Sequence, residues 1–495
     1  MQGTKEEVQQ STSQVSLLLQ VSHAYGAGYA PASFCYDVFA FEHLRASLYV
    51  SDDNDDTVDV QTVDFPTVLF LDPSLLQHGQ VDFLRASSPV PSHVLKLLGT
   101  IDEIHSAATN FFGHIHKWMP FISKKRFYEV HLRSSFQSQP DVALLLLCLE
   151  LITTLPPSKP RNPQTALYHA AKHFYLTVEG SEVLSLPVLQ AGVLLALYEL
   201  GHGIFPAAYL SIGACARYAH ALGINTNQNT TGGRRVLTMV EVEERRRVWW
   251  AIVIMDRFVS IGCPGRPLAT ADPSLDDLLP ADDALWDQGI VRSEHSIPLA
   301  SPLTDHMSKF ALLCQAARLL GQVLQHASGA APAHDTVWRQ LDRTLNSMLT
   351  AALSTDTPDD DQIAFIYSVL VALYPPRLFS PSSAAAGHPF DAERAARGRE
   401  VMEEITGVVG QNLVERDCFL GRAPAGMSPW GLFFAYRICG YHMRERCRDG
   451  AGDRPGLAEI VVERLRGGLR AIDVRWNVAG VYLRLLEAQE ALRNP

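Results

Sequence analysis

The spacing of apolar residues predicts a helical chain from Ser92 onward, because long segments carry apolar residues three or four positions apart. Alternating apolar and polar runs, which are typical of strands, are scarce after residue 70. Val188–Leu200 and Ala207–Leu222 are predicted to form a helical hairpin, with the glycines and the proline of 201–206 as breakers between them. We therefore predict an all-α fold in which any strand is confined to the first 90 residues.

The first 90 residues have a different pattern from the rest of the chain. Ser51–Asp56 (SDDNDD) predicts an acidic loop, and Pro66, Pro73, Pro89 and Pro91 follow it as breakers of regular structure. We expect residues 1–90 to form a poorly structured, partly disordered N-terminal segment. We expect residues 91–495 to form one large multi-helix domain.

Residues 245–258 (RRRVWWAIVIMDRF) join three arginines to a run that is apolar on every helical face. Glu241 precedes Arg245 by four residues and Glu243 precedes Arg247 by four, so each acid can neutralise an arginine of its own helix. A helix that is apolar all round is a buried helix. We therefore expect Trp249, Ile252, Val253 and Met255 to be nearly fully buried, and Arg245–Arg247 to be mostly exposed at the N-terminal end of the helix.

Composition and charge narrow the class of protein. The chain has 495 residues, of which 47% are hydrophobic and 19% charged, as in ordinary globular proteins. Its net charge of -11 gives no general attraction to a polyanion, so any DNA contact needs a local basic patch or a separate module. The 8 cysteines are scattered and form no C-x-x-C pair, which favours single buried thiols in a reducing compartment over a metal site.

Neither a signal peptide nor a membrane segment is predicted. The first fourteen residues are polar, without an apolar signal core. The most apolar runs, Val142–Leu155 and Val188–Leu200, are shorter than the roughly 18 residues that a membrane helix needs, and they are interrupted by polar residues. We expect a soluble intracellular protein that has no membrane partner.

The search for chemistry finds no catalytic, cofactor-binding or metal site. His114 and His116 are two residues apart, so on a helix they point in different directions, and packed or capping histidines are favoured over a shared metal. Lys124–Arg126 is too short for a convincing DNA patch and is interpreted as a solvated helix start. The chain contains no P-loop, zinc-protease or nucleophile-elbow motif.

Gly265, Arg266 and Pro267 follow the apolar helix and allow two interpretations. The favoured one is a sharp helix stop, because glycine and proline dominate residues 262–267. In that case Arg266 is expected to pair with Asp272 or Asp276 and to hold the loop. The other interpretation is that the triplet forms a wall of an effector pocket.

Taken together, these residues resemble a known family signature. The matching residues are Arg245, Arg246, Arg247, Trp249, Trp250, Asp256, Arg257, Gly265, Arg266 and Pro267. They resemble the fungal-specific transcription factor domain, the regulatory middle homology region of fungal binuclear zinc-cluster regulators. Phe111–Glu129, Ala207–Asn225 and Arg475–Glu487 are similar to other blocks of that domain and occur in the same order. The resemblance covers about residues 60 to 490.

One departure from the family limits what the resemblance implies. Zinc-cluster regulators carry six cysteines near a basic stretch, whereas only Cys35 lies in the first 140 residues here. We therefore expect no direct DNA binding and no zinc from this chain alone. Three alternatives stay open: the gene lost the module, an exon is missing from the sequence, or the protein regulates by association.

The resemblance implies a non-enzymatic transcriptional regulator in the nucleus. It would act as a homodimer, or as a heterodimer with zinc-cluster regulators or other transcription proteins. The family often occurs beside secondary-metabolite genes, which suggests control of such a cluster. The alternative is an all-α small-molecule-binding protein or enzyme on the same scaffold.

Overall fold

The computed structural model describes three strands in the first 88 residues and most of residues 89–492. The gaps within that range are 134–135, 158–160, 181–183, 225–236, 293–296, 302–306, 329–334, 356–357, 380–388, 416–425 and 450–455. The strands are β1 (Leu44–Val50), β2 (Asp59–Asp64) and β3 (Phe83–Arg85), in an antiparallel sheet of order β2-β1-β3. The predicted acidic loop and the predicted disorder of residues 1–90 fall largely outside the described residues.

Helices make up most of the described chain after residue 90, so the predicted all-α fold is confirmed. No strand occurs in the described part of residues 100–490, where Leu278 and Pro298 form only an isolated bridge. The domain boundary at residue 90 stays a prediction.

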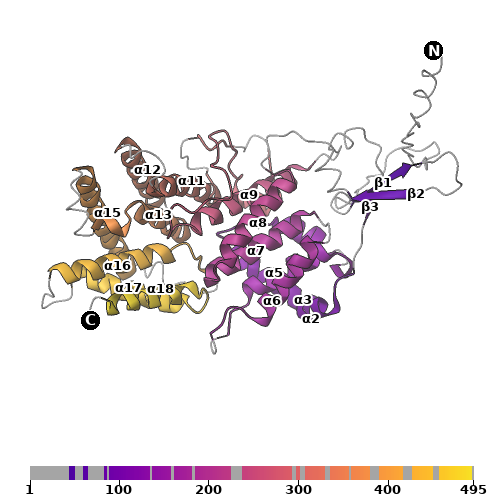
Figure 1. Cartoon of the computed structure of the whole chain (residues 1–495), viewed down its shortest axis with the longest axis horizontal. Helices are drawn as coiled ribbons and strands as arrows, with labels where there is room; N and C mark the ends of the chain where they lie inside the picture. The colour runs from indigo at the N-terminus through magenta and orange to yellow at the C-terminus, as the bar shows by residue number, and fades with distance from the viewer. Residues whose placement is uncertain are drawn as a thin grey trace, which may run out of the picture.

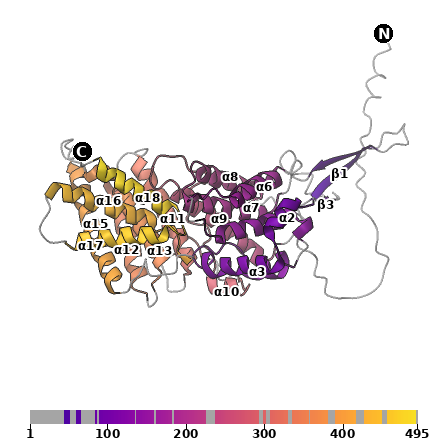
Figure 2. The same ribbon diagram turned by 90° about the horizontal axis from the view of Figure 1, so that it is seen from below.

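The first group of helices lies on one side of the molecule (Figures 1 and 2). It comprises α2 (Ser92–Leu98), α3 (Ile101–Asn110), the π-helical turn η2 (Phe111–Ile115), α4 (Lys124–Arg126), the π-helical turn η3 (Phe127–His131), the 3₁₀ turn η4 (Phe136–Ser138), α5 (Pro140–Thr153), α6 (Ala166–Glu179), α7 (Leu186–His202) and α8 (Ala207–Ala221). α5 packs against α2, α3, α6 and α7, and so forms the centre of this group.

The hairpin predicted between residues 188 and 222 is present. Ser185 accepts a hydrogen bond from the backbone N–H of Val188 and caps α7, and Pro187 occupies the first turn, where proline fits. Gly203 ends the helix in the left-handed conformation, with φ of 67°. Every side chain of α7 is buried, because α5, α6, α8 and α9 (Met239–Phe258) cover its faces.

The second group of helices lies on the other side (Figures 1 and 2). It comprises α11 (Lys309–Ser328), α12 (Asp335–Leu353), α13 (Asp360–Leu373), the 3₁₀ turn η6 (Pro376–Phe379), α15 (Pro389–Glu415), α16 (Leu432–Asp449), α17 (Leu457–Ile472) and α18 (Val478–Ala491). The short helix α10 (Asp283–Asp287) precedes it in the chain. α9 packs against α7 and α8 of the first group and α11 of the second, so one helix joins both groups.

A second junction is made by Arg475–Asn477, just before α18. The Trp476 indole N–H donates to the carbonyl of Met427 at 2.7 Å, and the Arg475 guanidinium lies 3.9 Å above the Trp476 ring. Arg475 also donates to the carbonyl of Ile152 at the end of α5, at 2.5 Å. The backbone N–H of Asn477 donates to Nδ1 of His202, and burial lowers the pKa of His202 to about 3, so this imidazole is a neutral acceptor. The C-terminal tail therefore docks on the first group.

The buried apolar side chains of both groups form one continuous hydrophobic core. Cys148, Cys215, Cys314 and Cys439 are single buried thiols within it, as expected, whereas Cys263 is exposed. Burial raises the pKa of the Cys148 thiol to about 12. Among the described helices, none combines the length and the apolar composition that crossing a bilayer requires.

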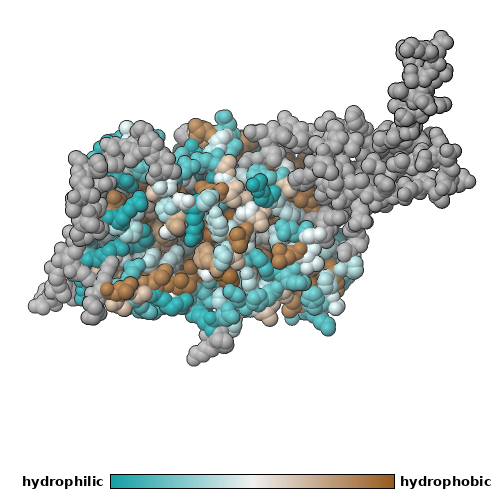
Figure 3. All heavy atoms as spheres, viewed as in Figure 1, coloured by the Kyte–Doolittle hydropathy of each residue, from teal (hydrophilic) through white to brown (hydrophobic). Residues whose placement is uncertain are grey.

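Polar and apolar residues are interspersed over the face of the molecule seen in Figure 3. The most exposed large apolar side chains belong to different elements, for example Ile101 of α3, Leu176 of α6 and Leu210 of α8. Single exposed apolar residues are normal for globular proteins.

We predict that Gly201→Ala weakens the junction with the tail. A Cβ at Gly201 would lie 2.2 Å from a ring carbon of Trp476, so the indole must move. Overpacking of this kind costs about 1–3 kcal/mol. Urea denaturation of the purified variant and of the wild type measures this loss of unfolding free energy.

Gly467→Ala in α17 is the matched control. A Cβ at Gly467 meets no atom within 4 Å, so alanine should stabilise the helix by about 0.5–1 kcal/mol. A Gly201→Ala variant that is as stable as Gly467→Ala would contradict the close packing of Trp476 on α7.

Candidate functional site

α9 begins where its sequence provides a reciprocal cap. The Thr238 hydroxyl accepts from the backbone N–H of Glu241 at 3.3 Å, and the Glu241 carboxylate accepts from the backbone N–H of Thr238 at 2.8 Å. The apolar residues that follow are buried as predicted, since Trp249 is 5% exposed and Ile252, Val253 and Met255 are 0% exposed. The Trp250 indole donates to the carbonyl of Leu278 at 2.9 Å and is also buried.

The prediction that Arg245–Arg247 are mostly exposed is wrong. Arg247 is fully buried, and Arg245 and Arg246 are half-buried. Arg246 donates to Glu243 at 2.6 Å, and Arg245 donates to the carbonyl of Leu222 at 3.1 Å. The arginine side chains therefore lie against the protein rather than in solvent. Some of their partners, such as the carbonyl of Leu222, belong to other elements and cannot be predicted from the spacing along one helix.

Arg247 is the centre of a buried charged cluster. Its Nε donates to Oε1 of Glu243 at 2.9 Å, which confirms the predicted pair four residues apart. Its Nη1 donates to Asp283 at 2.8 Å and to the carbonyl of Pro120 at 3.1 Å, and its Nη2 donates to the carbonyl of Ala281 at 2.7 Å. The guanidinium also lies 4.7 Å from the centre of the Trp286 ring. Almost every donor of this buried cation is satisfied, as a charge in the interior requires.

Glu244 forms a second buried cluster next to the first. Its carboxylate accepts from the backbone N–H of Ser123 at 2.8 Å, from Arg126 Nη1 at 2.5 Å and from Gln190 Nε2 at 2.9 Å. Arg126 also reaches Glu241 at 3.3 Å. The interpretation of Lys124–Arg126 as a solvated helix start is therefore wrong for Arg126, although Lys124 and Lys125 are exposed.

Asp256 and Arg257 hold the loop that follows α9. Asp256 accepts from the backbone N–H groups of Ala269 and Thr270, at 3.1 Å and 2.9 Å. Arg257 donates to the carbonyl of Ala271 at 2.7 Å. Burial lowers the pKa of Arg257, while the charge of Asp256 opposes that shift. This pair fixes a stretch that lacks regular structure.

Gly265, Arg266 and Pro267 lie on the surface of that loop, and Gly265 has a φ of 103°, which favours glycine. Arg266 is exposed and pairs with neither Asp272 nor Asp276 among the described contacts, so the predicted pairing is wrong. Asp272 lies 3.7 Å from Arg257 instead. Arg257 is the arginine nearest to Asp272 because it belongs to α9, which the loop covers. The triplet lines neither cavity described below.

His114 and His116 have different surroundings and do not form a common binding site. His116 is buried and bonds Asp287 of α10 through Nε2 at 2.8 Å, whereas His114 is half-buried at the edge of a cavity. Burial lowers the pKa of His116, which its contact with Asp287 partly offsets. Within the described residues, no group of three or more histidine, cysteine or acidic side chains could hold a metal.

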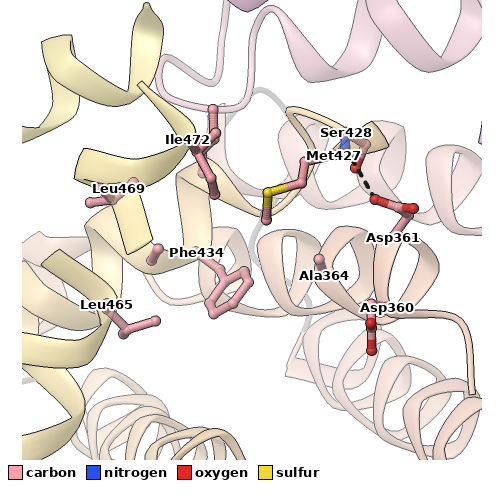
Figure 4. A pocket seen from close by; sticks show the side chains of 12 residues that line it. Asp360, Asp361, Ala364, Met427, Ser428, Phe434, Leu465, Leu469 and Ile472 are labelled. Carbon is pink, nitrogen blue, oxygen red and sulfur yellow. Dashed lines mark hydrogen bonds between the residues drawn. The ribbon is translucent and has the colours of Figure 1, made fainter. Parts of the chain in front are cut away.

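Besides a small gap of about 10 Å³ beside Trp118 and Phe310, two cavities lie at the start of α13. The larger has a volume of about 670 Å³ and is hereafter called the basin; its walls come from η2, α4, α10 and the first residues of α11 and α13. The smaller, of about 50 Å³, is an apolar cleft between α13, α16 and α17. In Figure 4, Met427 and Phe434 lie between the apolar side chains of α17 and Ala364, and the Ser428 backbone N–H bonds Asp361. Asp361 lines both cavities.

A polar cluster on α6, α7 and α8 was not visible in the sequence. Glu199 is fully buried and accepts from Lys172 at 2.9 Å, from Ser211 at 2.5 Å and from the Tyr168 hydroxyl at 2.9 Å. Lys172 Nζ and Ser211 Oγ are 2.7 Å apart, as in serine–lysine pairs that activate a hydroxyl. These residues line neither the basin nor the cleft, and their hydrogen bonds join α6, α7 and α8.

After residue 90 the described chain is a helical scaffold whose central helix α9 carries buried arginines. A family model described as the fungal specific transcription factor domain matches residues 108–370, more than half of the chain. The chain belongs to this family. No solved structure matches it.

Similar proteins are named as transcription regulators. Transcription factor BOA15 of Botryotinia fuckeliana is 37% identical over 166 residues, which are 34% of this chain and 92% of that protein. The arabinolytic transcriptional activator araR of Emericella nidulans is 46% identical over 61 residues, which are 12% of this chain and 7% of that protein. The pigment biosynthesis transcriptional activator pigB of Monascus ruber is 25% identical over 190 residues, which are 36% of this chain and 34% of that protein. The matched segments thus span 7% of araR and 34% of pigB.

We predict that Arg247→Met destabilises the protein by about 3–5 kcal/mol. The change removes one of the two arginines bonded to the buried Glu243, and it leaves Asp283 and the carbonyls of Pro120 and Ala281 without their arginine donor. Arg266→Met in the same sequence motif is the control. The Arg266 side chain is exposed, so this substitution should change the free energy of unfolding by no more than about 0.5 kcal/mol. Urea denaturation compares both variants with the wild type. Equal stability of the two variants would contradict the role assigned to Arg247.

Proposed function

We propose that this chain regulates transcription in the nucleus through protein contacts of its helical domain, and that it does not contact DNA itself. The burial of the basic run of α9 carries this proposal. Arg247 donates to Glu243, Asp283, Pro120 and Ala281, so its charge is not available to a phosphate. DNA-binding surfaces present arginine and lysine side chains to the phosphate backbone. The net charge of -11 further opposes binding to a polyanion.

The proposed partners are a second copy of this chain or a zinc-cluster regulator that supplies the DNA contact. The family membership supports this, because residues 108–370 match the domain that the family shares. The matches to araR and pigB also cover only parts of those proteins. A protein that keeps the regulatory domain can compete for, or recruit, whatever that domain contacts in a partner.

The proposed target is a gene cluster for a secondary metabolite. The support is the similarity to pigB, whose name describes it as a pigment biosynthesis activator. The relatives' names also favour a regulator over an enzyme. The alternative of a small-molecule-binding protein is favoured by one observation, the basin of about 670 Å³, which is large enough for a metabolite.

We predict that the purified 495-residue chain shows no sequence-selective DNA binding in a gel-shift assay at physiological salt. The reason is that the basic side chains of α9 are engaged within the protein. A zinc-cluster regulator with its own recognition site serves as the positive control. A selective shift by the 495-residue chain alone would overturn this part of the proposal.

We predict that deletion of the gene changes the transcript levels of a gene cluster, and that the wild-type chain restores them. The Arg266→Met variant should restore them as well, because its fold is intact, whereas Arg247→Met should not. A pull-down of the tagged chain should recover a second copy or a zinc-cluster regulator. Unchanged transcripts, together with a purified protein that turns over a metabolite, would favour the enzyme alternative.

A further inference from the structure

The outer face of α18 carries an exposed run of apolar side chains, hereafter called the α18 stripe. It consists of Val481, Leu485, Ala488 and Leu492, whose spacing of four, three and four residues places them on one side of the helix. Leu485 is 45% exposed and Leu492 is 84% exposed, while Ala488 is exposed and Val481 is half-buried. α18 runs along the lower edge of the molecule in Figure 1, which is the side seen in Figure 2.

The opposite face of α18 holds the helix in the domain. Ala479 and Leu486 are fully buried, and the ring of Tyr482 stacks on that of Tyr436 of α16 with centres 4.8 Å apart. The amide of Gln489 donates to the hydroxyl of the same Tyr436 at 2.6 Å. Packing within one copy of the chain therefore uses the inner face, and the α18 stripe is left open to a partner.

The spacing of the α18 stripe suits a second copy of the same helix. Val481 precedes Leu485 by four residues, and Ala488 follows it by three. When two α18 helices meet antiparallel at Leu485, each Leu485 packs on its counterpart, and Val481 of each copy meets Ala488 of the other. Leu492 then lies opposite Val478, which is seven residues before Leu485. A larger side chain meets a smaller one in every outer layer, and the two-fold axis makes both halves of the contact identical.

The charges beside Leu485 favour the same antiparallel pairing. Arg484 and Glu487 are exposed, and neither forms an ion pair with a described residue. The charge of Arg484 acts on Asp473, but that carboxylate already pairs with Arg161 at 2.6 Å. In the antiparallel pair, Arg484 of each copy lies at nearly the same height as Glu487 of the other, so two opposite-charge contacts form. In a parallel pair in register, each of these charges would face its own like.

We propose that two copies of this chain associate through the α18 stripe, with the helices antiparallel and Leu485 on the two-fold axis. This deepens the proposed function by naming the second copy as a partner. Its regulatory role rests on that function, whereas the association itself does not.

The size of the surface sets the expected strength of the association. α18 has 14 residues, so the helix is about 21 Å long. Phe205 is 51% exposed and follows Gly203, which lies beside Val478 and Val481, so the apolar surface continues past the start of the helix. A contact of this length is at the small end of specific protein–protein interfaces. We therefore expect a reversible dimer with a dissociation constant in the micromolar range.

Sedimentation velocity of the full chain from about 1 to 100 µM tests the association, and we expect the wild type to pass from monomer to dimer. Leu485→Glu brings two like charges together on the axis and should weaken the dimer about tenfold or more. Leu176→Glu is the matched control, because Leu176 is a 56% exposed helical leucine on α6, and this variant should associate like the wild type. Equal urea denaturation curves verify that the folds of both variants are intact.

A charge exchange tests the pairing of Arg484 with Glu487. Arg484→Glu and Glu487→Arg should each weaken the dimer about tenfold, because each replaces two attractive contacts by two repulsive ones. The double variant Arg484→Glu/Glu487→Arg should restore the association of the wild type. A double variant that stays as weak as the single variants would contradict the antiparallel pairing.

Cysteine cross-linking with copper phenanthroline as the oxidant tests the position of the axis. The thiols introduced by Leu485→Cys meet on the axis, so this variant should form a disulfide-linked dimer. Leu492→Cys should not, because antiparallel pairing separates the two copies of position 492 by about 21 Å, whereas a disulfide needs Cα atoms about 6 Å apart. The wild type, in which Cys263 is exposed, gives the background.

Several outcomes would overturn the proposal: a monomer at every concentration, equal weakening by Leu485→Glu and Leu176→Glu, or equal cross-linking at positions 485 and 492. A monomeric chain that loses a zinc-cluster regulator in the pull-down on Leu485→Glu would assign the α18 stripe to that partner and reject the self-association. Failure of the association is distinguishable from failure of the regulatory function. A dimer without any transcript change in the deletion strain retains the association and rejects the regulator, and transcript changes caused by a monomeric chain do the reverse.

Discussion

The buried guanidinium of Arg247 is the contact on which the arrangement of the domain depends. An uncompensated charge in the interior costs several kcal/mol, so the group is stable there only with most of its donors satisfied. Its partners come from α9 itself, from the segment before α4, and from α10 with the loop that leads into it. Three parts of the chain that are distant in sequence are thereby fixed on one central helix, and that helix also joins the two groups of helices.

The same principle recurs at other buried arginines. Arg257 holds the loop after α9 through the carbonyl of Ala271, and Arg475 holds the C-terminal tail against the end of α5 through the carbonyl of Ile152. A guanidinium suits this role because it carries five donors in a planar fork and stays charged when buried. Loops that form no regular hydrogen bonds of their own thus acquire fixed positions.

Sequence reasoning predicted the helices, the hairpin of α7 and α8 and the buried face of α9, because these follow from local periodicity. It also predicted the pair of Glu243 and Arg247, whose spacing brings them together on one helix. It failed for the exposure of Arg245–Arg247, since Asp283 and the carbonyl of Pro120 lie far from them in sequence. The basin could not be predicted for the same reason, because its walls come from segments between Phe112 and Gly426 that only the fold brings together.

The most direct test of the central claim is the rate at which each arginine of the folded chain reacts with phenylglyoxal, measured by peptide mass spectrometry. Arg247 and Arg257 are 0% exposed, whereas Arg266 of the same motif lies on the surface. We expect rapid modification of Arg266, and protection of Arg247 and Arg257 until the protein is unfolded in urea. Modification of Arg247 in the native protein at the rate of Arg266 would contradict it, because the basic run would then be a surface open to DNA.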